Sequence, residues 1–353
     1  MAVASSVIDS LSPEWLTQIL RKNGCLTASQ VVAFSTQRIG DEVGFLDAIS
    51  RLILTYDQKE KHAPDSLVIK VSSTDATYQR IGDFYHAYER EFHFYETIAP
   101  NSPIRLPRCF GREVDPQTNA HLLLLEDLSL LTAGDQVQGL TPTQARASVE
   151  TIGQFHAFWW ESTQLESLTW MPCRHMVPSR YQAAWPKFRD LFRGQLSASA
   201  LALGDHLSLH LETLLEQIEQ RPRTIVHSDF RADNLLFDLP TDPQPVVILD
   251  WQLAIRSTGM LDVARLLCGS MHPLDRAACE MEIVERWRET LEVGGVRGYS
   301  LKQAIADYKT CAWISLYYPV TIHEAEEAAG KRGTALAHAQ IQRFFTAAEE
   351  LNV

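Results

Sequence analysis

The fold is decided by the stretch IVHSDFRADNLLF, residues 225–237, together with VVILDW, residues 246–251. Each piece contains a short apolar run, and the residues between the two runs include three prolines. Apolar runs on either side of a proline-rich turn predict the two strands of a hairpin. Pairing of these strands would bring together three polar side chains, those of Asp229, Asn234 and Asp250.

These three side chains offer two carboxylates and one amide oxygen. Such oxygen atoms are the ligands that hard divalent cations prefer, and one carboxylate would remain for proton transfer. The set suits the transfer of a phosphoryl group to a hydroxyl. The alternative is a structural hairpin in which Asp and Asn cap turns. The joint agreement of spacing and flanking strands favours the catalytic interpretation.

The pattern His-x-Asp-x-x-x-x-Asn, followed by Asp-Trp, resembles the kinase-like small-molecule phosphotransferases, which include aminoglycoside phosphotransferases and choline kinases. The phrases HSDFRADNLLF and LDWQ are most similar to the ecdysteroid-kinase-like branch. This resemblance implies ATP-dependent transfer of the γ-phosphoryl group to a hydroxyl of a small molecule. It makes Asp229 the catalytic base, with Mg²⁺ held by Asn234 and Asp250.

The length of the chain, 353 residues, exceeds what one hydrophobic core usually supports, so we expect two lobes. The resemblance specifies an α+β, protein-kinase-like fold. Its small N-terminal lobe would combine an antiparallel sheet with a helix, and its larger C-terminal lobe would be mainly helical. We assign nucleotide binding to residues 1–126, and catalysis and acceptor binding to residues 127–353.

Composition limits the partners and the location of the protein. The formal net charge of −12 argues against a nucleic-acid partner and mildly favours a cationic or magnesium-bound ligand. No stretch approaches the roughly 18 uninterrupted apolar residues of a membrane span, so we expect no membrane partner. The six cysteines are scattered, without a Cys-x-x-Cys pair, and the chain does not begin with a basic and then apolar segment. These features indicate buried thiols in the reducing cytoplasm.

A glycine-bearing turn separates two predicted strands near the N-terminus, residues 31–34 and 50–56. Its glycines, Gly40 and Gly44, allow the flap that lays backbone amides over nucleotide phosphates in kinase folds. Two glycines alone favour an ordinary hairpin, and only the elements that follow favour the flap. The acidic residues between them, Asp41 and Glu42, leave individual phosphate contacts open.

The next apolar strand, residues 66–71, is interrupted by Lys70. A lysine in a buried strand needs an anionic partner unless it lies on an edge that faces water. Glu91 lies beside the apolar stripe of a helical stretch that follows, and Glu89 and Glu96 are nearby alternatives. The resemblance favours Lys70 with Glu91, the pair that orients the α and β phosphates in kinase folds.

The run HLLLLEDL, residues 121–128, predicts a buried strand that ends in acidic residues. It resembles the segment that crosses between the lobes in the kinase-like family. The resemblance therefore implies that backbone groups from Glu126 to Leu128 bind the adenine edge. Backbone contacts leave no trace in residue type, so this assignment depends on the order of elements along the chain.

Helical periodicity and capping signals predict most of the remaining chain, whereas residues 162–206 appear irregular. His156 interrupts an apolar helical run and is expected to be a hydrogen-bonded core residue. Asp262 opens a helix, where it can satisfy free amides or brace the catalytic loop through Arg231 or His227. The predicted helices are residues 13–23, 84–99, 142–159, 207–218, 260–267, 275–291, 301–318 and 335–351.

Two other functions compete with this interpretation. A protein kinase is disfavoured because Trp251 and Gln252 follow the metal aspartate in place of Phe-Gly, and no Ala-Pro-Glu closes an activation segment. A pseudokinase that binds nucleotide without transfer is disfavoured because each catalytic position holds a competent residue. The acceptor stays open between a hydroxylated lipophilic molecule, which the closest resemblance suggests, and an amine or aminoglycoside, which the acidic charge and the aromatic residues would suit.

Overall fold

The computed structural model describes residues 11–39, 47–73, 76–115, 120–238, 246–328 and 330–351. The predicted flap glycines, Gly40 and Gly44, lie outside these residues. The chain divides into two compact units. Unit 1 comprises Met1–Pro100 and Leu106–Leu130, and unit 2 comprises Asn101–Arg105 and Leu131–Val353.

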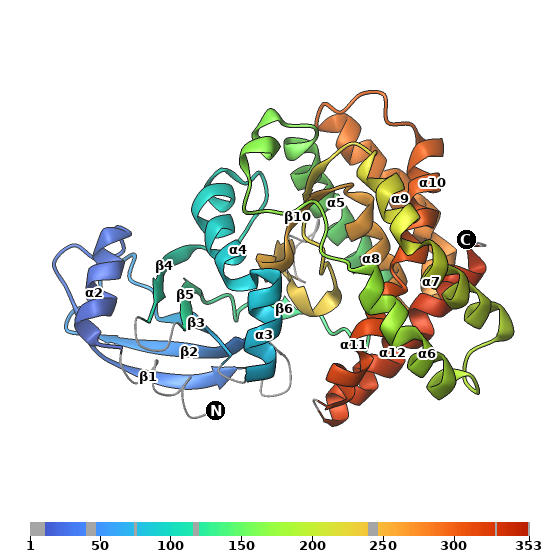
Figure 1. The fold of residues 1–353 in the computed structure, drawn as a ribbon. Helices are drawn as coiled ribbons and strands as arrows, with labels where there is room; N and C mark the ends of the chain where they lie inside the picture. Colours follow the sequence, from blue (N-terminus) through green and yellow to red (C-terminus); the bar gives the residue numbers. More distant parts are fainter. Residues whose placement is uncertain are drawn as a thin grey trace. The chain divides into compact units, whose positions relative to one another are not determined.

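Unit 1 is built on a five-stranded antiparallel sheet with the strand order β1-β2-β3-β5-β4 (Figure 1). Its first helix packs on β1 and β4 and begins as the sequence predicted, because the Ser12 side chain accepts a hydrogen bond from the amide of Trp15. The elements of unit 1 are α2 (Pro13–Lys22), β1 (Val31–Ile39), β2 (Asp47–Tyr56), β3 (Ser66–Ser72), α3 (Ala76–Tyr85), α4 (Ala87–His93), β4 (Cys109–Val114) and β5 (His121–Glu126).

Two features of unit 1 differ from the sequence prediction. The single helix predicted over residues 84–99 is broken at His86, which has a left-handed backbone with φ 49°, and α4 continues into a π-helical turn, Phe94–Ile98. β4 has no counterpart among the elements predicted from the sequence. β4 lacks the alternation of apolar and polar residues that marks a strand, because it contains a glycine and charged residues and lies exposed at the edge of the sheet.

Unit 2 is mainly helical, which together with the sheet of unit 1 confirms the predicted fold class. Neighbouring helices pair as α5 with α9, α8 with α10, and α11 with α12 (Figure 1). Its elements are β6 (Thr132–Ala133), α5 (Pro142–Trp159), α6 (Pro178–Phe192), α7 (Ala198–Glu219), β7 (Thr224–Val226), β8 (Leu235–Phe237), β9 (Val246–Ile248), β10 (Ile255–Ser257), α8 (Met260–Ser270), α9 (Pro273–Val293), α10 (Leu301–Ile314), α11 (Tyr317–Ala328) and α12 (Lys331–Glu350).

Prolines explain where the helices of unit 2 depart from prediction. The helix predicted over residues 301–318 ends at Ile314, and α11 begins at Tyr317, because Pro319 has no amide hydrogen to continue the ladder. The region predicted as irregular contains α6, which includes Pro186 in its interior. Buried aromatic side chains at helical spacing offset the cost of that proline; they are Tyr181, Trp185, Phe188 and Phe192.

Two small antiparallel sheets carry the decisive stretch of sequence. β8 and β9 form the predicted hairpin and are joined by β6, while β7 pairs with β10.

Within the described residues, none of the helices has the length and apolar character required to cross a membrane. All six cysteines are unpaired, and Cys25, Cys268 and Cys311 are buried.

Candidate active site

The hairpin places the predicted metal ligands at one end of its two strands. Leu235 of β8 lies opposite Ile248 of β9, and the amide of Leu249 donates a 2.9 Å hydrogen bond to the carbonyl oxygen of Asn234. Asn234 directly precedes β8 and Asp250 directly follows Leu249, so both side chains leave the same end of the hairpin.

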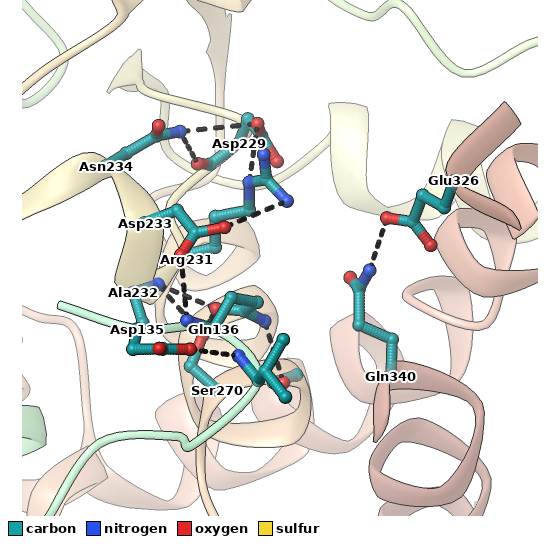
Figure 2. Close-up of polar contacts among 12 residues, drawn as sticks. Asp135, Gln136, Asp229, Arg231, Ala232, Asp233, Asn234, Ser270, Glu326 and Gln340 are labelled. Atoms are coloured by element: carbon teal, nitrogen blue, oxygen red, sulfur yellow. Dashed lines mark hydrogen bonds and ion pairs between the residues drawn. The ribbon is translucent and has the colours of Figure 1, made fainter. Parts of the chain in front are cut away.

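Asp229 lies in the loop between β7 and β8, close to Asn234 (Figure 2). The Asn234 amide nitrogen donates to the Asp229 carbonyl oxygen at 2.9 Å and to its carboxylate Oδ2 at 3.3 Å. The same carboxylate meets two cations, with Arg231 Nε 3.2 Å from Oδ2 and Arg265 Nη2 3.1 Å from Oδ1. Its side chain remains 21 % exposed, so solvent or a ligand can still reach it.

Charges around Asp229 keep it ionised. Burial by itself would raise the pKa of Asp229, but Arg231 and Arg265 outweigh burial and lower the pKa below its usual value. Burial by itself would lower the pKa of Arg231, but Asp229 and Asp233 outweigh burial and raise the pKa above its usual value. Arg231 is therefore a permanent cation. The loop therefore presents a carboxylate that accepts hydrogen bonds and donates none.

Asp262 holds the start of this loop. Its two carboxylate oxygens accept hydrogen bonds of 2.8 Å from the backbone amides of His227 and Ser228, and its side chain is fully buried. The predicted bracing by Asp262 is therefore present, and it acts through backbone amides. Arg231 does not take part, because it pairs with Asp229 and Asp233.

His227 ties the loop to the strand that carries Asp250. Its Nδ1 accepts a hydrogen bond from the amide of Asp229 at 3.2 Å, so the ring proton resides on Nε2 and is donated to the carbonyl of Leu249 at 2.7 Å. The ring also packs on buried Trp251, with centroids 4.7 Å apart. His227 thus joins the backbone of Asp229 to Leu249, the residue before Asp250.

His156 is a fully buried core residue, as the sequence predicted. The indole Nε1 of Trp287, which can only donate, lies 3.1 Å from His156 Nδ1. The ring proton therefore resides on Nε2 and points to Asp262 Oδ2 at 3.1 Å. Because Asp262 holds the loop that contains Asp229, His156 supports that loop from the core.

Ser228 and Asp250 adopt the left-handed backbone conformation, with φ values of 73° and 65°. Residues other than glycine rarely adopt it, and such strain is often concentrated at functional sites. Ser228 is held in place by His175 Nδ1, which lies 2.9 Å from its hydroxyl, and by the Tyr318 hydroxyl, which donates to its carbonyl at 2.9 Å. Neither His175 nor Tyr318 was singled out by the sequence for this role.

We expect Tyr318→Phe to lower the free energy of unfolding by about 1–2 kcal/mol, because the buried carbonyl of Ser228 loses its donor. The substitution keeps the ring that packs 3.9 Å below the guanidinium of Arg265, so the change reports on the hydroxyl alone. Urea unfolding at equilibrium measures the difference. A variant with unchanged stability would show that this hydrogen bond does not form in solution.

A second polar group supports the far side of the loop. The Asp233 carboxylate accepts a 2.8 Å hydrogen bond from the amide of Gln136 and pairs with Arg332 of α12 at 3.2 Å. The Gln136 side chain in turn accepts a hydrogen bond from the amide of Ala232 at 2.8 Å (Figure 2). No local sequence pattern indicates these contacts, because Gln136 and Arg332 are far from the loop along the chain.

The donor set fits a magnesium ion. Asn234 uses its amide nitrogen for Asp229, which leaves the oxygen Oδ1 for a cation. Asp250 contributes a carboxylate at the same end of the hairpin, and the side chain of Gln252 donates to its Oδ2 at 3.1 Å. Mg²⁺ is typically bound by one or two protein oxygens, with substrate phosphates and water completing its shell.

Unit 1 contains the predicted pair of Lys70 and Glu91. Lys70 Nζ lies 2.8 Å from Glu91 Oε2, and their side chains are only 8 % and 2 % exposed. The two alternatives point elsewhere, since Glu89 pairs with His86 and Glu96 pairs with Arg112. The expected ion pair between strand and helix is therefore present, while its role towards a nucleotide stays a prediction.

The segment predicted to bind the adenine edge, Glu126 to Leu128, begins at the last residue of β5. The amide of Glu126 already donates a 2.8 Å hydrogen bond to the carbonyl of Arg108, so it is engaged within unit 1. Binding of adenine by backbone groups from Glu126 to Leu128 stays a prediction. Asp127 is held by Arg51 at 2.7 Å and by Ser66 at 2.5 Å, which fixes the backbone at this point.

Comparison with known proteins gives the family. The sequence profile of the ecdysteroid kinase-like family matches residues 43–293, which is well over half of the chain. The chain belongs to the ecdysteroid kinase-like family. The matched segment includes Lys70 and Glu91 as well as Asp229, Asn234 and Asp250, so the family signature covers both the buried ion pair and the hairpin.

Curated relatives of this family member are longer proteins. Acyl-CoA dehydrogenase family member 10 of Mus musculus is 25% identical over 185 residues, covering 51% of this chain and 16% of the mouse protein. Acyl-CoA dehydrogenase family member 11 of Gallus gallus is 23% identical over 247 residues, covering 66% of this chain and 29% of the chicken protein. The chain thus spans less than a third of the length of either relative.

Solved structures share the fold at low sequence identity. A choline kinase from Cryptosporidium parvum Iowa II is 12% identical with a TM-score of 0.58, covering 97% of this chain and 96% of its own. An aminoglycoside 2″-phosphotransferase solved with GDP and kanamycin is 13% identical with a TM-score of 0.56, covering 94% and 98%. Amicoumacin kinase hAmiN, in complex with AMP-PNP, Ca²⁺ and Ami, is 12% identical with a TM-score of 0.55, covering 94% of this chain and 93% of its own.

Proposed function

We propose that this protein transfers the γ-phosphoryl group of ATP to a hydroxyl group of a small molecule. The observation that carries the proposal is the Asp229 carboxylate, which is ionised, partly exposed and fixed by Asn234, Arg231 and Arg265. Structural neighbours in this family of folds bind nucleotides together with small hydroxylated molecules, as in the kanamycin and amicoumacin complexes. Those complexes support nucleotide use by this chain as well.

In the proposed reaction, the acceptor oxygen forms a bond to the γ phosphorus while the bond from that phosphorus to the β–γ bridging oxygen breaks. Asp229 orients the acceptor hydroxyl and takes its proton. A lowered pKa makes Asp229 a weak base, which suits a loose transition state in which the proton leaves late. Orientation and electrostatic stabilisation then supply most of the rate enhancement.

Other residues of the chain would bind the nucleotide. Asn234 and Asp250 would hold Mg²⁺, which when bound neutralises charge on the phosphates. Lys70, fixed by Glu91, would bind the α and β phosphates, since an ammonium group carries three N–H donors. Gly40 and Gly44 are proposed to cover the phosphates, and backbone groups from Glu126 to Leu128 to bind the adenine.

The experiment is an assay of phosphoryl transfer from ATP with Mg²⁺ to a panel of aminoglycosides, choline, macrolides, sterols and sugars, with products identified by mass spectrometry. A phosphorylated product that disappears in the Asp229→Ala variant would support the proposal and identify the acceptor class. Tight ATP binding without any product or ATP hydrolysis would contradict it and favour a nucleotide-binding pseudokinase.

A further inference from the structure

Glu326 is an acid buried inside unit 2. It lies on α11 with 1 % of its surface exposed. One carboxylate oxygen, Oε1, accepts a 2.5 Å hydrogen bond from Nε2 of Gln340 on α12 (Figure 2). The other oxygen, Oε2, has no hydrogen-bond partner among the residues that the structure describes. A buried acid with an unsatisfied oxygen is costly, so its presence requires an explanation.

Gln340 connects Glu326 to the catalytic loop. The side-chain oxygen of Gln340 accepts a hydrogen bond from Arg265 Nη1 at 3.2 Å. Nη2 of the same guanidinium lies 3.1 Å from Asp229 Oδ1. Side chains from α11, α12, α8 and the loop therefore form one chain of hydrogen bonds, which we call the relay: Glu326, Gln340, Arg265 and Asp229.

Packing around Arg265 explains why the relay is needed. The guanidinium is buried, with its central carbon 3.9 Å from the ring centroid of Tyr318 and 5.2 Å from that of Phe344. Aromatic faces attract a cation but do not fix its rotation within its own plane. The hydrogen bonds to Gln340 and Asp229 at the two ends of the guanidinium determine that rotation.

We propose that Glu326 is a positioning residue for the transfer reaction, which it serves by holding Gln340 and Arg265 so that the Asp229 carboxylate faces the acceptor hydroxyl. This inference rests on the proposed function. Glu326 itself is too deeply buried to touch a substrate, and it acts only through the relay. A loss of alignment at Asp229 should lower kcat and leave substrate binding almost unchanged.

The charge of Glu326 gives the relay a distinctive pH dependence. The pKa of Glu326 is raised to about 7, mainly by burial and in part by the nearby charge of Asp229. The cations Arg231 and Arg265 and the hydrogen bond from the Gln340 amide oppose this rise. Ionisation of Glu326 strengthens its hydrogen bond to Gln340, since bonds to charged acceptors are about twice as strong as neutral ones. We therefore expect kcat to rise with pH through about 7. Asp229 has a lowered pKa and would titrate far below this range.

Two substitutions test the relay in the whole 353-residue chain. Gln340→Leu breaks it, and we expect kcat to fall about tenfold while both KM values change less than about twofold. Glu326→Gln keeps the shape and can still accept the bond from Gln340, but it cannot ionise. We expect this variant to lose the rise in kcat near pH 7. The double variant should be no slower than Gln340→Leu alone, because one break already interrupts the relay.

Matched controls lie on the same two helices. Glu324 of α11 is exposed and pairs with Lys187 at 2.6 Å, and Gln342 of α12 is exposed. Glu324→Gln and Gln342→Leu should keep the kcat and pH profile of the unmodified protein. A rise near pH 7 that persists in Glu326→Gln, or a Gln340→Leu variant with unchanged kcat, would overturn the inference while leaving the proposed function intact.

A crystal structure of the Gln340→Leu variant separates the two proposals if the unmodified protein transfers phosphate to no acceptor. In that case the proposed function fails, and the relay is judged from Arg265 and Asp229. Loss of the ion pair between Arg265 and Asp229 in the variant would support the inference that the relay holds the Asp229 side chain in place. An ion pair that keeps its present geometry would overturn the inference on structural grounds.

Discussion

Replacing Asp229 by asparagine is expected to lower the rate of phosphoryl transfer by about a hundredfold or more, while the affinity for nucleotide changes less than about threefold. Asparagine has the shape of aspartate but cannot take the proton of the acceptor hydroxyl. The Asn234 amide that now donates to Asp229 Oδ2 can still donate to the amide oxygen of the new residue. The variant therefore tests the carboxylate and not the shape of the loop.

Asp229→Ala should be at least as slow, because it also leaves Arg231 and Arg265 without their shared carboxylate. Product formation is measured in single-turnover experiments, and nucleotide affinity by calorimetry with a non-hydrolysable ATP analogue. Asp190→Asn, an exposed position on α6, is the matched control and should keep full activity. An Asp229→Asn variant with turnover near that of the unmodified protein would contradict the assignment of the base.

The sequence predicted the position of candidate functional side chains best where they lie next to a strand that pairs with the next strand along the chain. Asn234 and Asp250 flank one hairpin and Asp229 lies in the loop just before it, so spacing along the chain predicts that these residues are close to the same end of the hairpin. Lys70 was found by a different argument, in which a charge inside an apolar strand needs a partner. The structure supplies that partner as Glu91 at 2.8 Å.

The supporting residues were missed because helices far apart in the chain bring them together. Arg265 lies in the apolar run MLDVARLL, residues 260–267, where its charge is as anomalous as that of Lys70. The argument that identified Lys70 would also have marked Arg265 as a buried cation in need of a carboxylate. It could not have selected Asp229 as the partner, because α8 approaches the loop only in the folded unit.

Glu326 and Tyr318 show a second limit of prediction from sequence. Their positions depend on the break between α10 and α11, which the periodicity of residues 301–318 concealed. In one uninterrupted helix, Tyr318 would end α10 and would have no reason to meet Ser228 or Arg265. Pro319 is the signal that could have placed the break, since a helix interior rarely accepts proline.

Asp262→Asn is expected to lower the free energy of unfolding by about 3–5 kcal/mol. The Asp262 carboxylate is fully buried and accepts hydrogen bonds from the amides of His227 and Ser228 and from His156 Nε2. Asparagine has only one acceptor oxygen, so its NH₂ group would face at least one of these donors. A buried amide that loses its acceptor costs about 1–3 kcal/mol, and the repulsion between two donors adds to that cost.

Urea unfolding at equilibrium measures this loss, with Asp275→Asn as the control because Asp275 is exposed in the first turn of α9. The control should change stability by less than about 1 kcal/mol. Equal stabilities for the two variants would mean that the buried amides of the loop find other acceptors. A destabilised Asp262→Asn variant that remains folded at low temperature should also be slow in transfer, since Ser228 holds its left-handed backbone directly beside Asp229. We therefore expect the stability of the loop and the alignment of the proposed base to depend on the same buried carboxylate.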